Sequence, residues 1–139
     1  MRPRLNLILL GVCDVARSTA FFEALGWPRA ASSHAGFVKF DLGGVVLAIQ
    51  SRDDFARDAG YADAQGNGFA GIALAYIARH PDDVPRVLAR AVALGAELVK
   101  PATKNAWGVA GYFRDPDGHL FEVLYEDGWQ FDAVDNLVV

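Results

Sequence analysis

The stretch that decides the fold occurs twice, first as residues 14–26, DVARSTAFFEALG, and again as residues 83–95, DVPRVLARAVALG. A shift of 69 positions (83 − 14 = 69) superposes the copies, with identical residues at seven of their thirteen positions. Both copies begin with Asp-Val and end with Ala-Leu-Gly. We therefore predict that the chain consists of two copies of one small unit, which would enclose a cavity when paired.

Each copy reads as a helix that follows a strand. The apolar run at residues 5–12 has strand length, and Asp14 can accept hydrogen bonds from the free amides of a first helical turn. Apolar residues then recur at helical spacing as far as Leu25, and Gly26 suits a helix C-terminus. Gly43 and Gly44, between two apolar stretches, predict a hairpin.

The same order of elements recurs in the second half. We place repeat one at about residues 4–50, a connector at 51–70, repeat two at 71–125 and a tail at 126–139. The connector is rich in Asp, Ala and Gly, as expected of a loop region, and we predict a short helix at residues 53–59 within it. The strands predicted for the second half are residues 72–79, about 97–100, 109–114 and 119–125.

Composition limits the classes of function. The 139 residues are 53% hydrophobic, which is enough for one compact domain. The net charge of −4 and the lack of a basic run argue against a nucleic-acid or anionic membrane partner. No apolar stretch has the length of a membrane span. The single cysteine, Cys13, excludes an internal disulfide, and we expect a cytoplasmic protein.

A motif near the end of the second repeat points to a family. Residues 111–123, GYFRDPDGHLFEV, together with the Asp-Val-x-Arg-Ser pattern at 14–18, resemble the vicinal oxygen chelate superfamily. That group contains glyoxalase I, extradiol dioxygenases, fosfomycin resistance enzymes and bleomycin resistance proteins. The resemblance covers residues 5–125 and implies an α+β fold, in which two βαβββ repeats form a cup-shaped mixed sheet with helices on the outer face. One fold can host many reactions, so the resemblance does not identify this one.

The resemblance also implies where a metal would bind. Catalytic members typically hold one divalent metal through four side chains, from the first and last strand of each unit. Counting from the helix caps and the turns, these positions fall on Leu7, Leu47, Tyr76 and Glu122. Only Glu122 is a good ligand for a divalent ion, and leucine cannot coordinate one. A slip of one residue would turn a side chain to the other sheet face and would bring in only Asn6 as a polar group. We therefore expect neither a metal nor another cofactor.

Glu122 is the strongest candidate for a functional residue. Burial of a carboxylate within an apolar strand has an unfavourable desolvation free energy, which a hydrogen-bond or ion-pair partner usually offsets. Glu122 could act as a general base or anchor a cationic or hydroxylated ligand. It could also be satisfied by Tyr76, an arginine or water. Tyr76 in turn could bind a ligand or simply pack.

Three further residues are candidates for the cavity lining. Leu7 and Leu47 would form apolar walls. Trp107, in a loop before a strand, could close over the cavity or stack on a flat ligand, or it could pack within its own loop.

These features favour a metal-free small-molecule binding protein of the bleomycin resistance type. We expect a homodimer that binds an apolar or aromatic molecule, with Glu122 as the polar contact and with Tyr76, Trp107, Leu7 and Leu47 around it.

Two rival functions stay open. A lyase, isomerase or dioxygenase-like enzyme would use Glu122 as base or metal ligand, and would show a second polar group beside Glu122. A regulatory or structural subunit would instead have its cavity filled by Leu7, Leu47 and Trp107.

Overall fold

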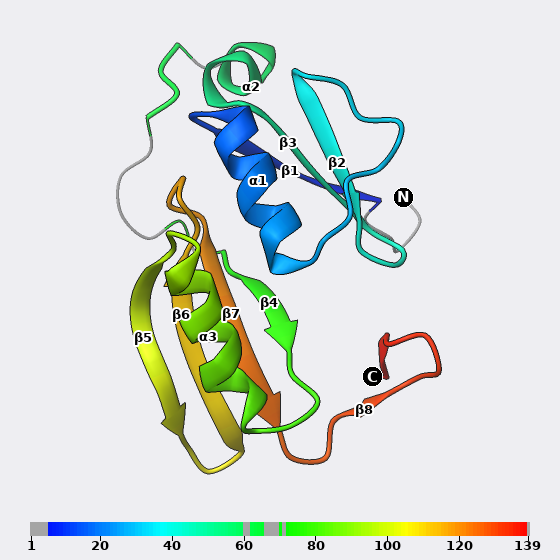
Figure 1. Cartoon of the computed structure of the whole chain (residues 1–139), viewed down its shortest axis with the longest axis vertical. Helices are drawn as coiled ribbons and strands as arrows, with labels where there is room; N and C mark the ends of the chain where they lie inside the picture. Colours follow the sequence, from blue (N-terminus) through cyan, green and yellow to red (C-terminus); the bar gives the residue numbers. More distant parts are fainter. Residues whose placement is uncertain (1–5, 60–61, 66–69, 71, 139) are drawn as a thin grey trace. The chain divides into compact units, whose positions relative to one another are not determined.

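The computed structural model describes residues 6–59, 62–65, 70 and 72–138 (Figure 1). The chain divides into two units, residues 1–68 and residues 69–139. Among the described residues, the first unit combines two helices with a β-sheet and the second unit combines one helix with its own β-sheet, so the predicted α+β class is confirmed.

The sheet of the first unit has the strand order β1-β3-β2. Strand β1 (Leu7–Val12) runs parallel to β3 (Val46–Ser51), and β2 (Phe37–Asp41) runs antiparallel to β3. Helix α1 (Val15–Leu25) connects β1 to the hairpin, and helix α2 (Arg52–Asp58) follows β3 directly. Within these described residues, the segment between α1 and β2 forms isolated bridges where the resemblance implied a fourth strand.

Helix α1 begins and ends as its sequence predicts. Asp14 is the N-cap, and its carboxylate accepts a hydrogen bond of 3.0 Å from the backbone amide of Arg17. Gly26 ends the helix with φ 105°, a left-handed conformation that glycine adopts without strain. Phe22 is 0% exposed and its ring centroid lies 5.6 Å from that of Phe40 in β2. Helix α1 therefore covers the sheet face that carries Phe40.

The sheet of the second unit has the strand order β4-β7-β6-β5. Strand β4 (Leu74–Ile77) runs parallel to β7 (Leu120–Glu126), whereas β6 (Gly108–Arg114) is antiparallel both to β7 and to β5 (Glu97–Lys104). Helix α3 (Asp83–Ala93) packs on one face of this sheet (Figure 1).

A glycine marks the face that α3 covers. A Cβ atom on Gly111 would lie 2.5 Å from Cδ1 of Leu88 in α3, so helix and sheet approach closely at this point. Gly111 pairs with Val123, which is fully buried. Two strand positions away, the rings of Phe113 and Phe121 stack with centroids 5.0 Å apart. These residues form the core of the second unit.

The Asp-Pro-Asp-Gly-His part of the family motif forms the turn between β6 and β7. The buried Asp115 carboxylate accepts hydrogen bonds from the backbone amides of Asp117 (2.9 Å) and His119 (2.8 Å). Its second oxygen lies 2.8 Å from Nδ1 of His119. Gly118 has φ 89°. The motif therefore has a structural role, because it fixes how β6 and β7 pair.

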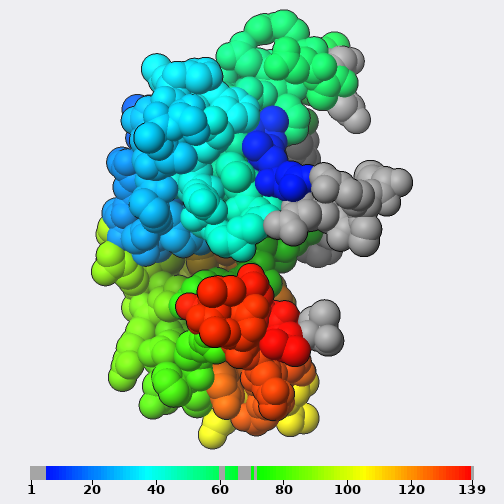
Figure 2. Space-filling view, turned by 90° about the vertical axis from the view of Figure 1, so that its right-hand side faces the viewer, coloured from blue at the N-terminus to red at the C-terminus, as the bar shows by residue number. Residues whose placement is uncertain are grey.

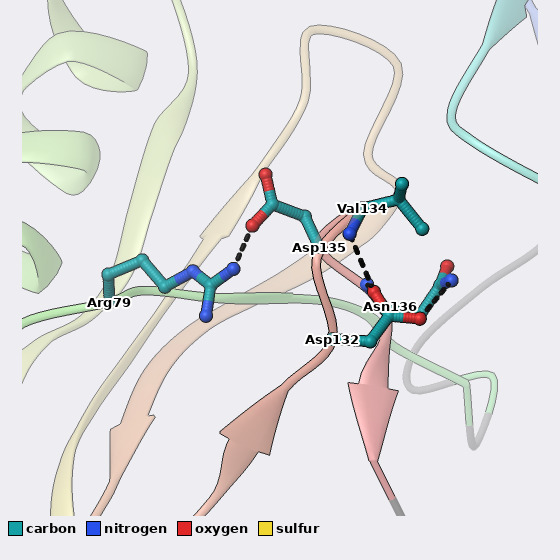
Figure 3. A network of polar contacts seen from close by, with 5 residues as sticks. All are labelled: Arg79, Asp132, Val134, Asp135 and Asn136. Carbon is teal, nitrogen blue, oxygen red and sulfur yellow. Dashed lines mark hydrogen bonds and ion pairs between the residues drawn. The ribbon is translucent and has the colours of Figure 1, made fainter.

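The predicted tail packs on the second unit. It forms a small hairpin from β8 (Gln130–Phe131) and β9 (Leu137–Val138). Figure 2 shows this segment, in red, lying against the rest of the unit. Arg79 holds it in place, since the guanidinium stacks 3.8 Å from the centroid of the Phe131 ring and pairs with the Asp135 carboxylate (Figure 3). Across the described residues, no helix is long and apolar enough to span a bilayer.

Candidate functional site

The sheet face opposite α3 carries a pair of polar side chains. Neighbouring residues of a strand point to opposite faces, so Tyr112 and Glu122 lie on the other side from Gly111 and Val123. Tyr112 and Glu122 are also directly opposite each other in the β6–β7 ladder. Because such cross-strand partners have adjacent side chains, the phenol and the carboxylate meet.

A hydrogen bond joins this pair. The Tyr112 hydroxyl donates to Oε1 of Glu122, and both side chains are partly buried. This bond, together with burial and the negative charge of Glu122, raises the pKa of the Tyr112 phenol above its ordinary value. Tyr112 therefore stays protonated at neutral pH and holds the carboxylate in one orientation. Among the described residues, no other hydrogen bond reaches the Glu122 carboxylate, so its second oxygen can accept from a ligand.

Two neighbours complete the surroundings of the pair. Lys100 in β5 pairs with Tyr112, and its Nζ lies 5.9 Å from the centroid of the phenol ring, at the limit of a cation–π contact. On the other side, Ala75 in β4 is the partner of Glu122 and is exposed. Its methyl group leaves space beside the carboxylate. The order across the face is thus cation, phenol, carboxylate, alanine.

The two predicted leucine walls lie on opposite faces of the first unit's sheet. Leu47 pairs with Phe40 on the α1 face and is 1% exposed, so the structure places it in the hydrophobic core instead of a cavity wall. Leu7 pairs with Val46, and therefore lies on the other face, where it is 41% exposed. Of the two leucines, only Leu7 remains available to line a cavity.

Tyr76 does not reach Glu122. It pairs with Val123, so its side chain lies on the α3 side of the sheet and is 48% exposed. The predicted hydrogen bond from a tyrosine to Glu122 exists, but Tyr112 makes it.

Trp107 is 40% exposed and lies in the loop between β5 and β6. Its backbone amide donates to Oδ1 of Asn105 (3.0 Å), and its carbonyl accepts from the amide of Asp127 (2.9 Å). The following residue, Gly108, pairs with Glu126, which is four residues along β7 from Glu122 (126 − 122 = 4). The structure thus places Trp107 beside the far end of β7.

Tyr112 and Lys100 are the residues that sequence reasoning missed. The signal for Tyr112 is present in the sequence, because Tyr112 and Glu122 are each five residues from the turn residue Asp117. A hairpin centred on that turn pairs them, as the structure shows. Lys100 offers no such signal, because the β5–β6 ladder contains register shifts on both sides of it.

The four positions that the resemblance implies for a metal do not carry a donor set that fits one. Leu7 and Leu47 have no donor atom, and Tyr76 lies on the sheet face opposite Glu122. The carboxylate of Glu122 already accepts from Tyr112 through one oxygen. Among the described residues, no group of three or more His, Cys, Asp or Glu side chains is arranged to hold a metal ion.

Comparisons with known proteins agree with this architecture. The sequence profile of the Glyoxalase/Bleomycin resistance protein/Dioxygenase superfamily matches residues 4–123. A glyoxalase-related enzyme from Fulvimarina pelagi is 29% identical, with a TM-score of 0.88 and coverage of 99% of this chain and 98% of that one. A search of curated proteins found no significant match.

Two other solved structures share the fold. A glyoxalase/bleomycin resistance protein/dioxygenase from Nocardioides is 25% identical, with a TM-score of 0.73 over 92% of this chain and 87% of that chain. A lactoylglutathione lyase from Agrobacterium tumefaciens is 21% identical, with a TM-score of 0.66 over 95% and 100% of the two chains. At that identity, the second likeness concerns the fold alone.

Proposed function

The chain belongs to the glyoxalase/bleomycin resistance protein/dioxygenase superfamily, and from this premise we propose that it binds a small organic molecule on the second unit. The binding surface is the sheet face that carries Glu122 and Tyr112. The observation that supports this proposal is the hydrogen bond between the two side chains, because it fixes a carboxylate that has one oxygen free to accept from a ligand.

The chemistry of this face defines the ligand class. The apolar residues Ala75, Ala110 and Leu124 alternate in the same phase as Glu122 and Tyr112, but only Ala75 is exposed, whereas Ala110 and Leu124 are buried. The methyl group of Ala75 and the partly buried phenol ring of Tyr112 suit an aromatic or apolar body, and the free oxygen of Glu122 suits a hydroxyl or ammonium donor. We propose that binding requires no metal, because Glu122 is the only good metal ligand among the four positions that the resemblance implies.

Matched probes test this proposal. Benzylamine and benzyl alcohol share an aromatic body and a donor, whereas benzoate presents a carboxylate to Glu122. We expect the first two to shift the backbone amide signals of β6 and β7 in ¹⁵N–¹H correlation spectra, with benzoate binding about tenfold more weakly. The Glu122→Gln variant should bind all three with similar affinity.

A second glutamate of the same sheet provides the control variant. Glu97 lies in β5 and pairs with Arg114 at 3.5 Å, so Glu97→Gln removes the same charge from another place on the sheet. It should leave the order of the three affinities unchanged. Benzoate binding as tightly as benzylamine, or Glu122→Gln preserving the discrimination, would contradict the proposed anchor.

An enzymatic function is the second candidate, and one observation favours it. Tyr112 is the second polar group beside Glu122 that an enzyme would be expected to show. The likeness to a glyoxalase-related enzyme at 29% identity points the same way. In this case Glu122 would take a proton from the substrate, and Tyr112 would act as a positioning residue through its hydrogen bond.

Metal content separates a metal-dependent enzyme from the binding protein. Tag-free protein would be analysed by inductively coupled plasma mass spectrometry before and after incubation with Mg, Mn, Fe, Ni or Zn salts. We expect no stoichiometric ion. One ion per chain that is lost in Glu122→Ala would overturn the metal-free proposal and put the enzyme first.

A further inference from the structure

We propose that the second unit has a separate site for a small organic cation, under the C-terminal hairpin. A cavity of about 360 Å³ lies there, within this unit alone. Its lining includes Ile77 at the end of β4, Arg79 two residues after that strand, Glu126 at the end of β7, and Trp129, Gln130 and Phe131 from the tail. This site is independent of the function proposed for Glu122.

The charges around the cavity favour a cation. Arg79 is the positive group of the lining, and the Asp135 carboxylate already neutralises it (Figure 3). The side chain of Glu126 has no hydrogen-bond or ion-pair partner among the described residues. It is partly buried, so water screens its charge less than at an open surface. The cavity therefore holds one uncompensated negative charge.

The aromatic rings support the same choice of ligand. The ring of Phe131 already binds a cation, because the Arg79 guanidinium stacks on it at 3.8 Å. The ring of Trp129, the aromatic side chain that attracts cations best, is 40% exposed beside the cavity. A ligand cation between Trp129 and Glu126 would gain a cation–π contact and a charge pair together.

The wall of the cavity that comes from the tail is fixed in shape. Asp132 accepts hydrogen bonds from the amides of Val134 and Asn136, each 2.9 Å long (Figure 3). Its side-chain bond with Asn136, together with these amide bonds, lowers the pKa of the Asp132 carboxyl. The loop ordered in this way presents Asp135 to Arg79. The hairpin therefore forms a preorganised wall, which reduces the entropic cost of binding.

A pair of probes of equal shape tests the site. Choline is a quaternary ammonium ion, and 3,3-dimethyl-1-butanol is its neutral carbon analogue. Binding is followed through the indole N–H signal of Trp129, which is identified by its loss in Trp129→Phe. Trp27, stacked on Phe22 in the first unit, provides an internal reference. We expect a saturating shift with choline at millimolar concentration and at least about fivefold weaker binding of the alcohol.

Two isosteric variants test which of two carboxylates binds the cation. Glu126→Gln should weaken choline binding at least about fivefold, with a spectrum that still shows a folded protein. Glu122→Gln should leave the choline-dependent shift of the Trp129 indole signal unchanged, which separates this site from the one under "Proposed function". Equal binding of the two probes, a shift that does not saturate, or a loss of choline binding in Glu122→Gln instead of Glu126→Gln would each overturn the proposal.

Discussion

Replacing Phe22 by alanine is expected to lower the free energy of unfolding by about 3–5 kcal/mol. Phe22 is 0% exposed, and its ring lies against three other aromatic rings, those of Phe21, Trp27 and Phe40. Alanine would lose the transfer free energy of the ring and leave a cavity between α1 and the sheet. The surrounding rings are too large to fill that cavity without leaving their rotamers.

Urea unfolding followed by far-UV circular dichroism measures this effect without depending on Trp27, whose fluorescence the substitution would change. Phe37→Ala is the control, because Phe37 is only partly buried and lies on the sheet face away from α1. Phe37→Ala should lower the free energy of unfolding by clearly less than Phe22→Ala. Equal costs for the two variants would show that the Phe22 cluster is not the core of the first unit.

Asp115→Ala is expected to destabilise the second unit by about 3 kcal/mol, because it leaves buried hydrogen-bond donors without partners. The amides of Asp117 and His119 lose their acceptor, and the His119 ring loses its contact with the second carboxylate oxygen. The β6–β7 turn would loosen, and the pairing of Tyr112 with Glu122 depends on that turn.

Asp115→Asn is the matched control, because its carbonyl oxygen can still accept from the two amides. It should cost less than half as much as the alanine substitution. Hydrogen exchange measured by mass spectrometry should show faster exchange in β6 and β7 for Asp115→Ala. Unchanged exchange there would mean that the strands alone, and not the turn, determine the register.

Much of the fold was predictable because its signals are local. The caps of α1, the glycine turn of the first hairpin and the Asp-Pro-Asp-Gly turn each depend on residues within a few positions of one another. The predicted short helix at 53–59 appears as α2, one residue earlier. We predicted a single domain made of two repeats, a connector and a tail, with boundaries near residues 50, 70 and 125. This division stays a prediction.

The candidate site was predictable only in part. Glu122 was found because a carboxylate stands out in an apolar strand. The sequence offered Tyr76, an arginine or water as its partner, whereas the partner is Tyr112, because choosing between tyrosines requires the facing of each strand. The 69-residue shift superposes buried positions of the two helices. Leu88 and Ala91 are buried in α3 at the positions that match the buried Thr19 and Phe22 of α1, and Val84 is also buried in α3. The shift does not keep the strands in phase.

The sequence by itself predicted two related units, and it determined where the helices α1 and α3 begin and end and which family the chain belongs to. The tertiary structure decided which strand residues share a face. Two residues separate β1 from α1, whereas five separate β4 from α3. The two hairpin loops also differ, with four residues after β2 and five after β6. Because side chains alternate with a period of two, an odd difference in connector length moves a residue to the other face. For this reason Leu47 is in the core, and Glu122 meets Tyr112.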